Sequence, residues 1–136
     1  METKFNFNSQ VCTSKVQSER LLALGLKKET ADCCYYYYDE EYLIAFAEDT
    51  KYPSDIPAWS LHRLMEITPD LIEYNHNTYI RQISKDSFSE ETIKYVMSGC
   101  KWMHIGDIHD CDIYRAFVKC IEWLIKEGYF NKEYLV

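Results

Sequence analysis

The stretch that decides the fold runs from Asp112 to Gly128 and reads DIYRAFVKCIEWLIKEG. Its apolar residues recur at three- and four-residue intervals, which is the spacing of one face of an α-helix. They are Ile113, Ala116, Phe117, Cys120, Trp123 and Leu124. Asp110 or Asp112 can cap the start of this helix, and Gly128 suits the left-handed position after its last turn. Because so amphipathic a helix is stable only when packed, the rest of the chain must supply an apolar surface.

Two shorter helices are predicted earlier in the chain, over residues 15–24 and 60–67. Ser14 begins the first, and Gln17, three positions later, completes a capping box with it. Ser60 is the N-cap of the second. Leucines supply the apolar side of both segments, so we expect them to flank the same core as the long helix.

The remaining apolar segments predict β-strands, because they are short, rich in aromatic and β-branched residues, and bounded by turn residues. The predicted strands cover residues 33–38, 42–47, 71–74, 78–83 and 101–105. The first four form two hairpins. Residues 89–98 leave a helix and a strand both open: Ser89 and Glu90 suit a helix start, whereas Ile93 and Tyr95 favour a strand.

These elements predict one α+β domain over residues 1–136. We expect an antiparallel sheet of about four to six strands packed against the long C-terminal helix, with two shorter helices beside it. Residues 1–11 read as an N-terminal arm in which Phe5 and Phe7 suit an edge strand. A chain of 136 residues can bury a core without disulfides or a metal.

The composition narrows the classes of function. A net charge of −7 argues against a protein that binds nucleic-acid phosphates, although an acidic chain could imitate a nucleic acid. The polar N-terminus METKFNFNSQ lacks a signal peptide's apolar core, and no apolar run is long enough to span a membrane. We therefore expect a cytoplasmic protein whose six cysteines stay reduced.

Three stretches resemble a known family. They are CTSKVQSERLLALGLKKETADCCY at residues 12–35, IPAWSLHRLMEI at residues 56–67, and the C-terminal helix ending in CIEWLIKEGY at residue 129. Together they resemble small uncharacterised proteins of gut Bacteroides and their prophages or mobile elements. The resemblance implies a cytoplasmic, phage- or mobile-element-associated accessory protein with no catalytic residue. It also favours a strand over residues 92–97.

The densest group of reactive side chains lies just before the long helix. His104, His109 and Cys111 carry ligand types that zinc prefers, and a thiol beside an imidazole could also act as a nucleophile. Their spacing matches no zinc module, so they are weak candidates for a metal site. The alternative is an exposed turn whose aspartates cap the helix. We expect no cofactor, and an enzyme is the less favoured reading.

Aromatic residues suggest the leading function. Tyrosine and tryptophan number 15 in all, more than a small core needs to bury. Tyr36, Tyr38, Trp59 and Trp102 are the candidates for a protein-binding surface. The chain is therefore predicted to be an accessory protein that binds another protein or itself through an aromatic, acidic surface. The alternative is a metal-dependent or thiol enzyme that uses His104, His109 and Cys111.

Overall fold

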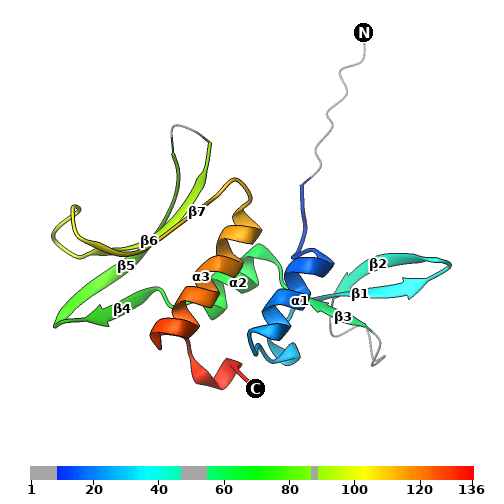
Figure 1. Cartoon of the computed structure of the whole chain (residues 1–136). Helices are drawn as coiled ribbons and strands as arrows, with labels where there is room; N and C mark the ends of the chain where they lie inside the picture. The colour runs from blue at the N-terminus through cyan, green and yellow to red at the C-terminus, as the bar shows by residue number, and fades with distance from the viewer. Residues whose placement is uncertain (1–8, 47–54, 87–88) are drawn as a thin grey trace, which may run out of the picture.

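The computed structural model describes residues 9–46, 55–86 and 89–136. Its fold is α+β, as the sequence predicts, with two antiparallel sheets on either side of the helices (Figure 1). The helices are α1 (Lys15–Ala23), α2 (Leu61–Ile67) and α3 (Ile113–Glu127), with 3-10 turns η1 (Lys28–Thr30) and η3 (Lys132–Tyr134). The strands are β1 (Cys33–Tyr38), β2 (Glu41–Phe46), β3 (Ile56–Ala58), β4 (Leu71–Tyr74), β5 (Asn77–Lys85), β6 (Glu91–Met97) and β7 (His104–Asp110).

The predicted strands divide between two sheets rather than forming one. Three strands in the order β2-β1-β3 make the smaller sheet, and four in the order β4-β5-β6-β7 make the larger. Residues 89–98, which local signals left open, contain strand β6. The strand predicted at 101–105 instead begins at His104 and continues to Asp110. The proposed strand around Phe5 and Phe7 lies outside the described residues.

Both predicted hairpins form, and each closes through a turn of unusual composition. Asp39 and Glu40 join β1 to β2 with φ values of 51° and 64°. Asn75 and His76 join β4 to β5 with φ values of 54° and 65°. Two consecutive positive φ values are typical of the tight turn that matches the twist of a hairpin. Because this turn favours Asn-Gly, Glu40 and His76 occupy positions where glycine would be less strained.

Helix α3 lies between the larger sheet and α1 (Figure 1). Asp112 is its N-cap and Gly128 ends it with a φ of 82°, both as predicted. The predicted face is buried or partly buried, but a second strip is buried as well: Tyr114, Val118 and Ile121. On that side the Tyr114 hydroxyl donates to the carbonyl of Gln10, just before α1. The helix therefore forms the centre of the core rather than its cover.

Trp123 fixes how α3 lies on the larger sheet. Its ring stacks on buried Tyr95 of β6, with the ring centroids 6.1 Å apart. Beneath the same ring, β7 has a bulge: Ile105 pairs with Tyr95 and Asp107 with Lys94, so Gly106 is the extra residue. Gly106 has a φ of 65°, and a Cβ added there would lie 2.9 Å from Trp123 Cη2. Only glycine gives both this backbone conformation and this space.

The smaller sheet is joined to the body at Trp59, which is fully buried. The Trp59 amide donates to Thr13 Oγ1, and its indole Nε1 donates to Thr30 Oγ1 at 2.9 Å. The neighbouring Ser60 amide and hydroxyl both donate to the carboxylate of Asp32. These bonds pair buried polar groups that would otherwise destabilise the junction, and they hold β1 and β3 against α1 and α2.

We predict that Gly106→Ala lowers the free energy of unfolding by about 3 kcal/mol, through the left-handed backbone and the contact with Trp123. Gly99→Ala is the matched control, since Gly99 also has a positive φ, 86°, but nothing lies within 4 Å of the added Cβ. Gly99→Ala should lower the free energy of unfolding by only about 1 kcal/mol. Urea unfolding of both variants measures the difference, and equal losses would show that the Trp123 contact contributes nothing.

Candidate functional site

The first candidate site is an apolar face of the β1–β2 hairpin, which projects from the helices (Figure 1). We call it the hairpin face and define it by Tyr37, Tyr42, Ile44 and Phe46. The cross-strand register places these four side chains on one side of the sheet. They are 63%, 46%, 47% and 65% exposed, respectively. So many large apolar side chains at adjoining positions form an exposed patch of the kind that marks interaction sites.

Contacts within the hairpin face order its rings. Tyr37 and Tyr42 meet edge to face, with centroids 5.2 Å apart. The ammonium group of Lys15, from α1, lies 3.9 Å from the centroid of the Tyr42 ring. Closer to the body, the same side of the sheet carries Tyr35, whose hydroxyl donates to the carbonyl of Thr13. The face is thus anchored at one end and exposed at the other.

The four aromatic residues predicted from the sequence do not form one surface. Tyr36 and Tyr38 alternate with Tyr37, so they lie on the opposite side of β1, where Tyr36 is half-buried and Tyr38 is exposed. Trp102 is 90% exposed, but it belongs to the connection between β6 and β7 of the other sheet. Trp59 is buried, so its assignment to a binding surface is wrong.

The second candidate site is the segment from His104 to Asp112. The sequence suggested an exposed turn here, but residues 104–110 form strand β7. The extra residue at Gly106 shifts the alternation by one position, so Asp107 and His109 lie on the outer side, whereas Asp110 is buried. Cys111 lies beyond the strand, where its Sγ accepts a hydrogen bond from Arg115 at 3.2 Å. The structure therefore does not gather His104, His109 and Cys111 around one point.

Asp110 organises the start of α3. Its carboxylate accepts from the amide of Asp112 and from Arg115 Nε at 2.9 Å, and it lies 2.8 Å from Lys119 Nζ. Burial alone would raise the pKa of Asp110, but hydrogen bonds and charge from Lys119, the Asp112 amide and Arg115 lower it well below its ordinary value. Its neighbour Asp112 caps the helix, so both aspartates have structural roles.

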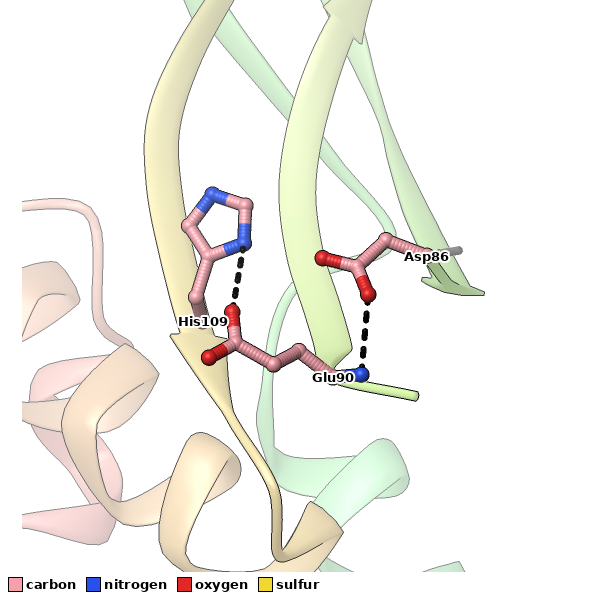
Figure 2. A group of neighbouring side chains, drawn as sticks. All are labelled: Asp86, Glu90 and His109. Carbon is pink, nitrogen blue, oxygen red and sulfur yellow. Dashed lines mark hydrogen bonds and ion pairs between the residues drawn. The ribbon is translucent and has the colours of Figure 1, made fainter. Parts of the chain in front are cut away.

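His109 instead meets two carboxylates that the sequence did not identify (Figure 2). Ligand atoms of Asp86, Glu90 and His109 lie within 4.8 Å of one another. Asp86 and Glu90 come from the turn between β5 and β6, and the Thr92–His109 pair places the imidazole beside them. The turn between β5 and β6 brings Asp86 beside Glu90, and the register between β6 and β7 brings His109 to them, an approach that sequence spacing does not reveal.

The cysteines form no disulfide, and their environments differ. Cys12, Cys33, Cys34 and Cys120 are buried, whereas Cys111 is exposed and Cys100 is intermediate. Burial raises the pKa of the Cys120 thiol to about 12, and burial together with the charge of Asp32 raises the pKa of Cys33 to about 12. Thiols held in the neutral form are poor nucleophiles, which agrees with the prediction that Cys120 serves as a small apolar residue.

Comparison of the chain with protein-family models, with curated proteins and with solved structures gives no match. Among the described residues, no helix has both the length and the apolar character that crossing a membrane requires. Assignment of function therefore depends on the geometry of the hairpin face and of the His109 cluster.

We predict that Asp110→Asn lowers the free energy of unfolding at pH 7 by about 2 kcal/mol, because charged hydrogen bonds to a buried carboxylate are lost. A carboxyl whose pKa is lowered on folding stabilises the native state above its unfolded pKa, and this contribution is lost as pH falls below about 4. The variant should therefore lose less stability than the parent between pH 5 and pH 2. Glu19→Gln, at an exposed carboxyl on α1, is the control; parallel pH profiles for parent and Asp110→Asn would contradict the assignment.

We also predict that Ellman's reagent labels the thiols of Cys111 and Cys100 in the native protein before the other four, because reaction requires an accessible thiolate. Mass spectrometry of the quenched protein identifies the labelled positions. Fast labelling of Cys120 in folded protein would be incompatible with its burial on the core-facing side of α3.

Proposed function

We propose that this chain is a cytoplasmic accessory protein that binds another protein through the hairpin face. The observation that supports the proposal is the exposure of Tyr37, Tyr42, Ile44 and Phe46 on one side of a projecting hairpin. Aromatic residues give large contact areas at low entropic cost and are enriched at the centres of interfaces. Burying these side chains against a partner would remove their exposed apolar surface from water, which favours binding.

The edge of the smaller sheet suggests how a partner binds. β2 is the outermost strand in the order β2-β1-β3, so among the described residues no strand pairs with its outer edge. An extended segment of a partner can add there as a further strand, using backbone hydrogen bonds for affinity. Its side chains would alternate, and every second one would lie beside Tyr42, Ile44 and Phe46 of the hairpin face.

Charge favours a basic partner. Asp39, Glu40 and Glu41 lie at the tip of the hairpin, next to the exposed tyrosines, and the whole chain carries a net charge of −7. Acidic groups beside an apolar face attract lysine and arginine and repel a second acidic chain at long range. We therefore assign the face to an extended basic segment of another protein rather than to a second copy.

Two further features support the cellular setting in this proposal. None of the six cysteines forms a disulfide, which is compatible with a reducing compartment such as the cytoplasm. The resemblance to small prophage and mobile-element proteins of Bacteroides stays a prediction, and it too suggests an accessory protein. The competing hypothesis is an enzyme that uses His104, His109 and Cys111. It is less favoured, because the Cys111 thiol accepts a hydrogen bond from Arg115 and does not contact His109.

The proposal is tested with two short labelled peptides, one of alternating lysine and valine and one of alternating glutamate and valine. We expect the lysine peptide to bind more tightly, with an affinity that falls as salt rises. Ile44→Asp should weaken that binding about tenfold, because the loss of buried apolar contact, up to about 3 kcal/mol, exceeds the attraction between one added exposed carboxylate and the lysines, about 0–1 kcal/mol. Fluorescence anisotropy measures both effects.

Leu71→Asp is the matched control, because Leu71 is a 52% exposed apolar residue on β4 of the other sheet. It should leave peptide binding unchanged. Equal binding of the two peptides, or insensitivity to Ile44→Asp, would overturn the proposal. A mass that doubles with concentration in light scattering and returns to that of the monomer in Ile44→Asp would assign the face to a second copy instead.

A further inference from the structure

The outer side of the larger sheet carries a histidine whose orientation is fixed from one side. His109 Nε2 lies 2.8 Å from Asp107 Oδ1, two residues earlier on β7. A carboxylate can only accept a hydrogen bond, so Nε2 carries the proton in the neutral ring. The unprotonated Nδ1 then accepts a hydrogen bond from the hydroxyl of buried Thr92, 3.2 Å away, and lies 3.9 Å from the carboxylate of Glu90.

Two carboxylates lie on the lone-pair side of this imidazole (Figure 2). Asp86 and Glu90 are fixed by the turn between β5 and β6, where the amide of Glu90 donates to Asp86 Oδ1 at 2.9 Å and the amide of Asp86 donates to the carbonyl of Glu90. The ligand atoms of the two carboxylates and of His109 lie within 4.8 Å of one another. Negative charge from the turn between β5 and β6 and an imidazole nitrogen from strand β7 therefore converge on one place.

We propose that Asp86, Glu90 and His109 form a zinc-binding site. One imidazole nitrogen and two carboxylates are ligands that Zn²⁺ accepts, with water completing a tetrahedral set. Ligands of one zinc ion lie about 3.4 Å apart for bonds of about 2.1 Å. Because the His109 and Glu90 side chains are 43% and 49% exposed, small rotations bring the three groups from their present separations to that distance.

Asp107 is the positioning residue of this site. A carboxylate on the far nitrogen of a ligating histidine fixes its tautomer and makes the ligating nitrogen more basic. Asp107 and His109 are two residues apart on β7 and so share a side, and the bulge at Gly106 makes that side the outer one. The proposed ion would also offset the repulsion among Asp86, Glu90 and Asp107.

The experiment is isothermal titration of ZnCl₂ into the full chain, carried out in a Cys100→Ser, Cys111→Ser background so that accessible thiols do not compete for the metal. We expect one zinc ion per chain. His109→Gln and Glu90→Gln should each abolish that binding, and Asp107→Asn should weaken it about 10- to 100-fold. His104→Gln is the matched control, because His104 is on the same strand and 4.0 Å from Asp107 but outside the three-residue cluster.

Nuclear magnetic resonance of the histidine rings locates the bound ion. Stoichiometric zinc should shift His109 Nδ1 and leave the nitrogens of His62 and His76 unchanged. Zinc binding that survives His109→Gln, or a His109 Nδ1 resonance that stays unchanged at saturating zinc, would overturn the proposal. Peptide binding at the hairpin face is independent of these outcomes, so the two proposals can fail separately.

Discussion

The packing of Trp123 over Gly106 is the constraint on which the rest of the structure depends. The indole reaches the sheet only because β7 has no side chain beneath it, and it then stacks on Tyr95 of the adjacent strand. This contact sets the distance between α3 and the larger sheet. Since α3 also packs against α1 on its other side, the same contact positions the smaller sheet indirectly, through α1 and the junction at Trp59.

The bulge that accommodates Trp123 also determines the chemistry of the opposite side of the sheet. An uninterrupted strand from His104 would place Asp107 toward the helix. The extra residue reverses this alternation, so that Ile108 enters the core while Asp107 and His109 remain outside. A single requirement of core packing thus arranges a histidine and its carboxylate on the surface.

Sequence reasoning succeeded where the signal is local. The periodicity of residues 112–128 and the caps at Ser14, Ser60 and Asp112 predicted helices that the structure confirms. It failed where the outcome depends on distant partners. Strand β3 was missed because it has three residues and includes a proline, and its pairing comes from β1. The His109 cluster was missed because its carboxylates arrive through strand register, and Trp59 was assigned to the surface because composition does not report burial.

The two sheets differ in how much core supports them, and this difference affects their dynamics. The larger sheet packs on the main core, whereas the small sheet shares a cluster of Cys12, Cys33 and Ala58, with Tyr35 against it. Regions with few buried apolar contacts unfold locally at a lower cost in free energy than unfolding of the whole domain requires. Amide hydrogens of β2 should therefore exchange with solvent while those of β5 and β6 remain protected. A partner strand paired with β2 would suppress this local unfolding. Slower amide hydrogen exchange in β2 would therefore show that its edge is occupied.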